Sequence, residues 1–340
     1  MSSCTSMTRN EGKPLVSVVI PNFNYGRYLD LRIQSVLKQT FHNFELILLD
    51  DASVDNSLEI LKLYGGGGYD RISHIVLNDS NSGNPFVQWH KGIQLARGKY
   101  VWIAEADDLC EPTFLENVIP LMETHRNASV CFVGNCRIDQ YGTHIEGDFN
   151  KWKPSYPAYC VFDGKEYIKH NLYWRNYIDN ASAVVFRKSM MKADNIRQCE
   201  QMRHSGDWLF WFYMAMNGDV IECYKVLNYF RQHPQKVTVK ATKSGMGEAE
   251  NMEIVRIMEQ HIPNLGNYRR RLRRGMFYNR IAKMNLECQT RDKLYELLRE
   301  KLGGTNRDGR FERFNRVARL FCPFVLTMKR DRLRPSRENH

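Results

Sequence analysis

Short apolar runs alternate with amphipathic stretches through the first 125 residues of the chain. Four of these runs are continuous, rich in β-branched or aromatic residues and bounded by turn-forming residues, so they predict buried β-strands. They cover residues 15–20, 44–49, 72–77 and 100–104. The stretches between them place apolar residues on one face at helical spacing and predict helices. This order predicts an α/β fold with a mostly parallel central sheet flanked by helices.

Three of the four predicted strands end in polar clusters that contain aspartate, and the last cluster is Glu105-Ala106-Asp107-Asp108. The carboxyl ends of parallel strands meet at one edge of a sheet, where open α/β sheets bind their ligands. Clustered carboxylates suit a hard divalent cation such as Mg²⁺ or Mn²⁺, and a cation held in this way suits a phosphate ligand. The sequence therefore predicts a nucleotide-type site at this edge, although such an acidic turn on its own is more often a solvated turn.

The pattern weakens over residues 137–176 and changes again beyond about residue 240. Strands are predicted at 129–133, 181–186, 220–224 and 226–230, with an apolar helix at 207–217. The later helices are expected at 248–260, 268–284, 291–301 and 313–330, the last one basic, amphipathic and kinked by Pro323. The expected organisation is a flexible N-terminus (1–13), an α/β domain (14–240) and a basic helical extension (241–340).

The net charge of +11 is concentrated in the C-terminal part of the chain, where residues 261–340 hold 21 lysines and arginines against 8 acidic residues. Such a region could contact an anionic membrane surface, nucleic acid or an anionic substrate. No nucleic-acid motif accompanies it, so nucleic acid is not an expected partner. No apolar run reaches membrane-spanning length, and residues 1–13 lack the apolar core of a secretory signal. With nine cysteines in no framework spacing, the expectation is a cytoplasmic protein with reduced thiols.

Two quoted stretches carry a resemblance to a known family. The run VSVVIPNFNYGRYLDLRIQSVLKQTFHNFELILLDDASVDNS, followed by NSGN and KGIQLARGKYVWIAEADD, resembles the donor half of a family 2 glycosyltransferase with the GT-A fold. The likeness is close over about residues 14–125 and looser, through SGDW and NYFRQH, over the acceptor half at 126–240. It implies inverting transfer of a sugar from a nucleotide-diphosphate donor, with UDP-sugars as the first expectation and Mn²⁺ or Mg²⁺ as the metal. The helical part beyond 240 is outside the resemblance.

The resemblance also implies roles for donor-binding residues. Pro21, Phe23 and Asn24 match the first nucleotide-binding loop, and Asp51 matches the acid that receives an N–H of a pyrimidine base. Its neighbour Asp50 is expected to fix the loop. Asp51 on its own could equally be a helix cap.

Metal and catalytic roles follow in the same way. Glu105-Ala106-Asp107 stands where the family has a D-x-D metal motif, with Glu in place of the first Asp. Asp107, helped by Asp108, is expected to bind the metal, and Glu105 to contact ribose or water.

The late motifs supply the remaining candidates. Asp207 in SGDW matches the general base, at a helix N-terminus whose dipole favours the ionised form. As a helix cap it would also be structurally sufficient. Arg231 and His233 match a late R-x-H element that could close over the diphosphate or add a metal ligand, although a lone histidine is usually structural.

The leading hypothesis is a bacterial-type enzyme that builds a surface polysaccharide or a lipid-linked glycan at the inner face of the membrane. The acceptor would be a hydroxyl of a glycan or lipid-linked molecule, and the basic C-terminal region would contact anionic lipid. One alternative is a non-catalytic module that binds nucleotide sugars or glycans, if Glu105 signals loss of activity. A sugar nucleotidyltransferase would need a Gly-rich basic loop after the first strand, where this chain has PNFN.

Overall fold

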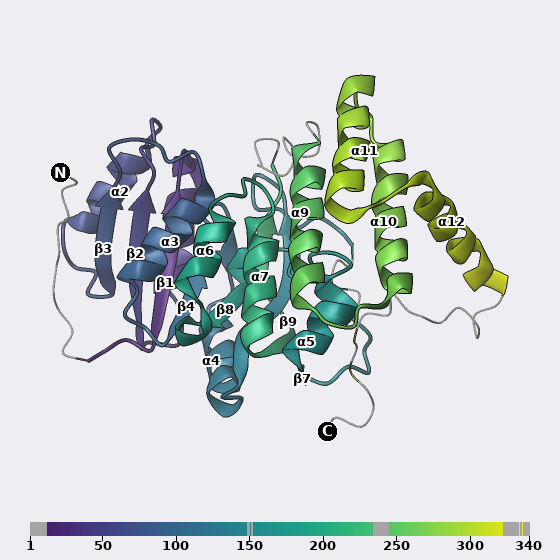
Figure 1. Cartoon of the computed structure of the whole chain (residues 1–340). Helices are drawn as coiled ribbons and strands as arrows, with labels where there is room; N and C mark the ends of the chain where they lie inside the picture. Colours follow the sequence, from purple (N-terminus) through teal and green to yellow (C-terminus); the bar gives the residue numbers. More distant parts are fainter. Residues whose placement is uncertain are drawn as a thin grey trace.

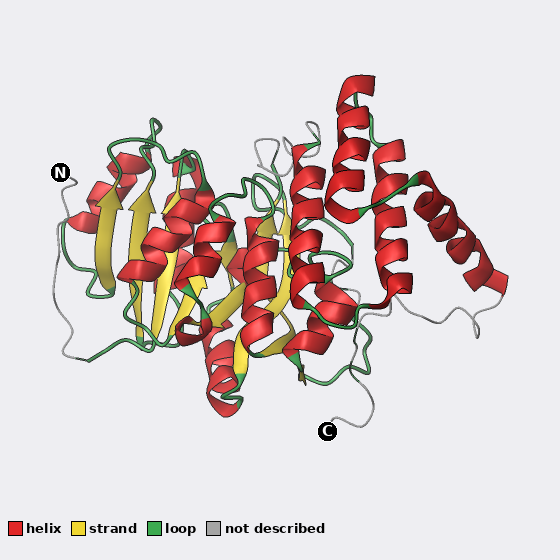
Figure 2. Cartoon of the chain, viewed as in Figure 1, coloured by secondary structure: helices red, strands yellow, loops and turns green. Residues whose placement is uncertain are grey.

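The computed structural model describes residues 12–147, 150, 152–233, 245–321, 333 and 335. Within this described part, nine strands form one mixed sheet with helices on both faces (Figures 1 and 2). The strand order is β3-β2-β1-β4-β8-β6-β9-β5, and β7 pairs with β9 outside that path. The predicted α/β class with a helical C-terminal region is confirmed.

The strands are β1 (Val16–Asn22), β2 (Phe44–Asp50), β3 (Ile72–Leu77), β4 (Tyr100–Ile103), β5 (Leu109–Cys110), β6 (Ala128–Ile138), β7 (Tyr159–Phe162), β8 (Val184–Arg187) and β9 (Asp219–Arg231). The helices of the α/β part are α1 (Gly26–Leu37), α2 (Ser57–Gly65), α3 (Pro85–Leu95), α4 (Phe114–Thr124), α5 (Gly164–Tyr167), α6 (Ala193–Cys199) and α7 (Gly206–Asn217). The helices after it are α9 (Met246–His261), α10 (Gly266–Lys283), α11 (Cys288–Leu302) and α12 (Asn306–Phe321).

The first four strands are parallel, as their alternation with helices predicts. Asn22 at the end of β1 lies opposite Asp50 of β2, and Asp50 lies opposite Leu77 of β3. β4 continues the parallel set on the other side of β1, and β8 then pairs with it antiparallel. The carboxyl ends of β1 to β4 therefore share one edge of the sheet.

Two apolar layers cover the sheet because side chains alternate between its faces. In β2, Leu46 and Leu48 join the layer under α1, α2 and α4. Ile47 and Leu49 join the opposite layer, which packs under α3, α6, α7 and α9 (Figure 1). α9 belongs to the residues beyond 240, so part of the helical extension completes the core of the α/β part.

Two strand predictions are wrong in detail. The strand expected at 181–186 begins with a 3-10 turn, Ala181–Ala183, because the Asn180 side chain accepts a hydrogen bond of 2.6 Å from Ser182 N. The strands expected at 220–224 and 226–230 are one strand, β9, which stays paired with β6 through several register shifts. The exposed residues at 225–226 interrupt its burial and look like a break in the sequence.

The predicted C-terminal helices are confirmed as α9, α10 and α11, and Gly303 ends α11 with a left-handed φ of 69°. The basic helix expected at 313–330 begins earlier, as α12 at Asn306, and its part beyond Phe321, including Pro323, lies outside the described residues. The flexible N-terminus expected at 1–13 also lies outside them up to residue 11. Among the described helices, none combines the length and the apolarity needed to cross a membrane.

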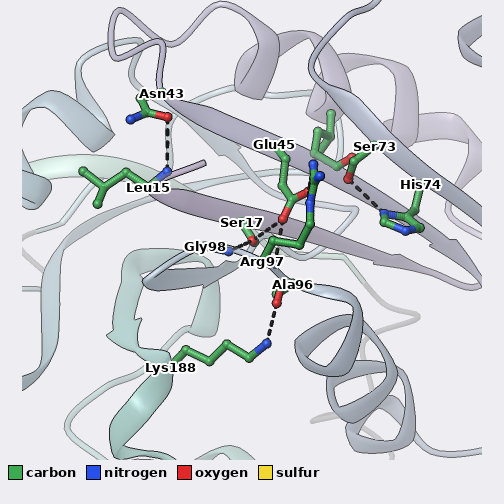
Figure 3. Close-up of polar contacts among 11 residues, drawn as sticks. Leu15, Ser17, Asn43, Glu45, Ser73, His74, Ala96, Arg97, Gly98 and Lys188 are labelled. Atoms are coloured by element: carbon green, nitrogen blue, oxygen red, sulfur yellow. Dashed lines mark hydrogen bonds and ion pairs between the residues drawn. The ribbon is translucent and has the colours of Figure 1, made fainter. Parts of the chain in front are cut away.

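The amino end of the parallel strands is fastened by Glu45 (Figure 3). Its carboxylate accepts hydrogen bonds from Ser17 Oγ at 2.6 Å and from Arg97 N at 2.8 Å and Nε at 2.9 Å. Burial opposes ionisation, but these hydrogen bonds outweigh it and lower the pKa of Glu45. Gly98 packs so closely that a Cβ there would lie 2.6 Å from Ser17 N. A small pocket of about 40 Å³ remains at this edge, whereas a much larger cavity opens at the carboxyl edge.

Candidate active site

A cavity of about 390 Å³ opens at the carboxyl ends of the parallel strands. Its wall also includes residues of α3, of the 179–181 turn and of the loop that leads into α7. Most of the site residues predicted from the sequence line it, namely Pro21, Phe23, Asp51, Glu105, Asp107, Asp108 and Asp207. Strand ends that are far apart in the sequence thus meet around one space, as the parallel topology predicts.

The loop after β1 is held in shape by the loop after β2. Asp50 accepts hydrogen bonds from Asn22 Nδ2 at 2.7 Å and from Ser53 N at 2.8 Å. Asn24 adopts a left-handed φ of 58°, and its Oδ1 accepts a hydrogen bond of 2.8 Å from Val54 N. Asp50 and Asn24 therefore fix the loop, while Phe23 stays 43% exposed at the cavity.

Asp51 is buried in the wall and surrounded by donors. Its oxygens accept hydrogen bonds from Asn78 Nδ2 at 2.7 Å, Ser82 Oγ at 2.7 Å and Gln88 Nε2 at 2.8 Å. These bonds hold the carboxylate in one orientation at the end of β2. The role of Asp51 towards a base N–H stays a prediction.

Three polar atoms in the wall are buried without a hydrogen-bond partner: Asn22 Oδ1, Gln88 Oε1 and His204 Nδ1. A buried polar atom without a partner costs free energy, about 1–3 kcal/mol for a neutral group. Such atoms are rare in native proteins. All three residues line the cavity, so the cavity wall is richer in unpaired polar groups than an ordinary core.

Glu105 is a half-buried carboxyl just after β4. Trp89 Nε1 donates to its Oε1 at 2.9 Å, and its own N–H donates to Ser182 Oγ at 3.0 Å. Burial, and then repulsion from the charge of Asp107, raise the pKa of Glu105 to about 8. The side chain of Glu is longer than that of the Asp expected in a D-x-D motif, and here it reaches the indole N–H of Trp89. The contact with Trp89 gives this replacement a structural explanation.

Asp107 pairs with His233 across the end of β9. The distance from His233 Nε2 to Asp107 Oδ2 is 3.0 Å, and the two side chains are 2% and 10% exposed. Tyr25 and Tyr28 pack against the imidazole with ring centroids at 5.5 and 5.7 Å. The imidazole is therefore held against the carboxylate, and its Nδ1 is buried without a partner.

These donors fit a divalent cation that shares its coordination with a phosphate ligand. Asp107 Oδ2 and His233 Nε2 are close enough to bind one ion together, and Mg²⁺-type sites commonly use one or two carboxylates plus substrate phosphates. No group of three or more His, Cys, Asp or Glu with metal-site geometry occurs in the described part of the chain. The remaining ligands would have to come from substrate and water.

Arg231 and Asp108 brace this region from behind. Arg231 is 2% exposed, and its guanidinium donates to the carbonyls of Asp107 at 2.7 Å and Asp139 at 3.0 Å. Asp108 accepts from Arg231 N at 2.9 Å and from Asn180 Nδ2 at 2.6 Å. Arg231 is thus directed at backbone carbonyls, and both oxygens of Asp108 are engaged. Their predicted contacts with donor and metal stay predictions.

Asp207 faces the same cavity from the N-terminus of α7. Trp208 N donates to its Oδ1 at 2.7 Å and Asn176 Nδ2 to its Oδ2 at 3.0 Å. Burial outweighs these hydrogen bonds and raises the pKa of Asp207 to about 6. α7 can approach α3 this closely because residue 206 is glycine, where a Cβ would lie 2.5 Å from Phe86 Cε2. A carboxylate with this pKa can accept a proton near neutral pH.

The loop before Asp207 is clasped by a residue that the sequence did not indicate. Glu250 of α9 accepts hydrogen bonds from three successive backbone amides, Arg203 N at 2.8 Å, His204 N at 2.9 Å and Ser205 N at 2.8 Å. Nothing in the local pattern marks Glu250, which is one acid among several on a helix. Asn176 and Trp89 were missed for the same reason, since their site contacts come from distant parts of the chain.

Comparison with known proteins gives the chain a family context. Residues 17–193 match the family model described as glycosyl transferase family 2. The chain is 35% identical over 136 residues to the glycosyltransferase GlyG of Streptococcus pneumoniae. This alignment covers 40% of this chain and 42% of GlyG. The chain is 33% identical over 134 residues to TuaG of Bacillus subtilis, a glycosyltransferase assigned provisionally to teichuronic acid biosynthesis. This second alignment covers 39% of this chain and 52% of TuaG. The chain thus spans about half the length of these curated relatives.

Solved structures share the fold at low sequence identity. The S. aureus TarS fragment 1–349 in complex with UDP-GlcNAc aligns with a TM-score of 0.55 and 18% identity, covering 92% of this chain and 76% of that one. The mannosyltransferase PcManGT from Pyrobaculum calidifontis, in complex with GDP-Man and Mn²⁺, aligns with a TM-score of 0.51 and 12% identity, covering 92% and 82%. These alignments confirm the predicted GT-A fold.

Proposed function

Because the chain belongs to glycosyl transferase family 2, we propose that it transfers a sugar from a nucleotide-diphosphate donor to a hydroxyl group. The acceptor would be a glycan or a lipid-linked molecule, and the configuration at the anomeric carbon would be inverted. A UDP-sugar is the first candidate donor, and polysaccharide biosynthesis is the proposed context. The observation that carries the proposal is that Asp51, Asp107 and Asp207 line one cavity at the carboxyl edge of the sheet. The structural neighbours solved in complex with UDP-GlcNAc and with GDP-Man support it.

The proposed division of labour follows the geometry. The loop of Pro21 and Phe23, together with Asp51, receives the nucleotide, and Asn24 keeps that loop in shape. Asp107 and His233 would hold Mn²⁺ or Mg²⁺, with Asp108 and Arg231 as supports beside them. When bound, the ion neutralises charge on the leaving diphosphate.

Asp207 is the proposed general base. Its carboxylate removes the proton from the acceptor hydroxyl as that oxygen attacks the anomeric carbon and the bond to the diphosphate breaks. The proton ends on Asp207, and the electron pair of the broken bond ends on the diphosphate oxygen. Attack from the side opposite the leaving group inverts the anomeric configuration. Holding both reactants in one cavity supplies the positional part of the catalysis.

The test of this function is a panel of nucleotide sugars and free nucleotides, each added with Mn²⁺ in a thermal-shift measurement. A ligand that binds only the folded protein raises the melting temperature in a concentration-dependent manner. We expect one nucleotide sugar to stabilise the protein more than its matching nucleoside monophosphate, and to be hydrolysed slowly in the absence of acceptor. Stabilisation without any turnover would instead favour a non-catalytic binding module. No stabilisation by any member would contradict the proposal.

Glu250 is expected to act as a positioning residue. In Glu250→Ala, three amides of the 203–205 loop lose their acceptor, so Asp207 is held less firmly. We predict a fall in kcat of roughly ten- to hundredfold, with donor-induced thermal shifts unchanged, and a smaller loss in Glu250→Gln, which keeps a carbonyl acceptor. The exposed acid Glu300 of α11 serves as the matched control in Glu300→Ala. An equal loss of kcat and of donor binding would point to general destabilisation and contradict the positioning role.

A further inference from the structure

Helix α12 packs against the protein with a polar face. Asp308, Glu312 and Asn315 are 7%, 0% and 3% exposed, and they recur at the spacing of one helix side. Asn279 Nδ2 of α10 donates to Glu312 Oε2 at 2.8 Å, and Arg271 Nε of α10 donates to Asp308 Oδ1 at 3.2 Å. Phe311 adds an apolar contact with Tyr268 of α10 at a ring-centroid distance of 5.3 Å, but most of the face that an ordinary surface helix would fill with apolar side chains is here taken by hydrogen-bonded acids and amides.

This orientation of α12 is fixed by close packing. Gly275 of α10 lies so near that a Cβ there would be 2.3 Å from the carbonyl oxygen of Asp308. Asn279 Nδ2 also donates to the carbonyl of Gly309 at 2.9 Å, and Tyr268 OH donates to Asn315 Oδ1. Rotation of α12 about its axis would break these contacts, so its outer face is a defined surface.

The outer face of α12 is apolar and basic. Its large apolar side chains are strongly exposed: Phe314 69%, Val317 53%, Leu320 78% and Phe321 78%. Their spacing places them on one side of the helix. Arg310 and Arg313 are exposed on that side, and Arg316, 53% exposed and ion-paired to Glu312 at 2.7 Å, borders it. We call these four apolar residues and three arginines the α12 face. Figure 1 shows α12 at the far end of the helical extension from the N-terminal strands.

We propose that the α12 face docks on an anionic membrane surface. Apolar side chains with arginines between and beside them suit the boundary between lipid headgroups and acyl chains, where the apolar groups enter and the guanidinium groups meet phosphates. Exposed apolar patches of this kind on soluble proteins mark interaction sites. Docking at the α12 face would bring the protein to the membrane that holds the proposed lipid-linked acceptor. The biological role of this contact rests on the proposed function, but lipid binding itself needs no sugar donor and can be tested separately.

Charge favours lipid over a second copy of the chain. In a two-fold self-contact the same patch meets itself, which would bring the arginines of both copies together. Nucleic acid would use the arginines but leave Phe314, Leu320 and Phe321 without apolar partners. An anionic lipid surface serves both kinds of side chain.

The test is co-sedimentation of the full chain with vesicles of phosphatidylcholine alone and of phosphatidylcholine mixed with phosphatidylglycerol. Wild-type protein should bind the anionic vesicles and be released by salt. Phe314→Glu with Leu320→Glu should weaken binding at least about tenfold. Arg310→Gln with Arg313→Gln should weaken it about fivefold per arginine and flatten the salt dependence.

Leu63→Glu on α2 is the matched control, because Leu63 is an apolar side chain 74% exposed on another helix and should leave vesicle binding unchanged. Equal binding by wild type and the Phe314→Glu/Leu320→Glu variant would overturn the proposal. So would a fall in molecular mass of that variant in gel filtration, which would identify the α12 face as a contact between copies. Donor hydrolysis is measured on the same samples: its absence in the wild type, with vesicle binding intact, would refute the transfer function and leave the lipid inference standing.

Discussion

Asp207→Asn is expected to abolish sugar transfer and, at the same time, to stabilise the folded protein above pH 6. The loss of transfer follows from removing the proposed base and should be about 10²–10⁴-fold in kcat. The substitution keeps the shape of the side chain, and the amide oxygen can still accept from Trp208 N, while the hydrogen bond from Asn176 Nδ2 is lost. Donor binding, measured by thermal shift, is therefore expected to persist.

The stability gain follows from the raised pKa of Asp207. A carboxyl with a pKa of about 6 in the folded protein and 3.8 as its ordinary value binds its proton more tightly when folded. The unfolded chain therefore releases that proton first, so stability declines as the pH rises from about 4 to 6, and the full penalty is present above 6. Because Asp207 is half-buried and partly screened by water, we expect a gain of about 1–2 kcal/mol on replacing it.

The measurement is thermal unfolding of both proteins from pH 4 to pH 8. The variant should melt a few degrees higher at pH 8, and the difference should disappear near pH 4. Asp194→Asn is the control, since Asp194 is 86% exposed on α6 and should show no such pH dependence. The wild-type kcat should fall below about pH 6 as Asp207 is protonated. Transfer that survives in Asp207→Asn would remove Asp207 from the role of base.

Removal of the divalent cation is expected to have the second largest effect. A chelator should eliminate transfer, and added Mn²⁺ or Mg²⁺ should restore it. In Asp107→Asn the site keeps the shape but loses the negative charge that attracts the ion, so restoration should fail. His233→Ala removes a proposed ligand and should weaken metal affinity at least about 10- to 100-fold, the range found for loss of a residue that only supports a ligand.

A readout without turnover separates metal binding from catalysis. Wild-type protein should be stabilised more by UDP with Mn²⁺ than by UDP alone, and Asp107→Asn should lose that difference. Asp292→Asn, at an exposed position on α11, is the control for removing one negative charge. If chelation leaves both the UDP shift and transfer intact, the reaction does not use a metal at this site.

The sequence predicted the carboxyl edge of the sheet because its signals there are local. A buried strand followed at once by Asp50 and Asp51, or by Glu105 and Asp107, can be recognised in a short window. The sequence pattern predicts two strands where the structure has β9, because the middle residues of β9 are exposed. A short stretch of sequence does not show that pairing with β6 continues through these residues. Long-range pairing overrides local burial at that point.

The parts of the site that could not be predicted depend on contacts between distant residues. Glu250 acts on amides 45 to 47 positions earlier in the chain, and Trp89 reaches Glu105 from α3. No spacing rule connects such residues, and only the folded arrangement shows which acid on a helix faces a loop. The polar inner face of α12 was hidden for a related reason, since its hydrophobic pattern predicts a surface helix without saying which side is the surface.

The clasp between α9 and the loop before Asp207 limits how modular this protein can be. A cut near residue 240, which the change of pattern suggests, would separate Glu250 from all three amides it holds. A shortened protein could retain the part of the cavity formed by the ends of β1 and β2, while Asp207, the proposed base, would no longer be held in one position. Exchange of the C-terminal extension for that of a relative should therefore keep full turnover only where the incoming helix brings a hydrogen-bond acceptor to this position. The extension thus contributes directly to the loop before the proposed base, although it lies outside residues 17–193, the part of the chain that matches the family model.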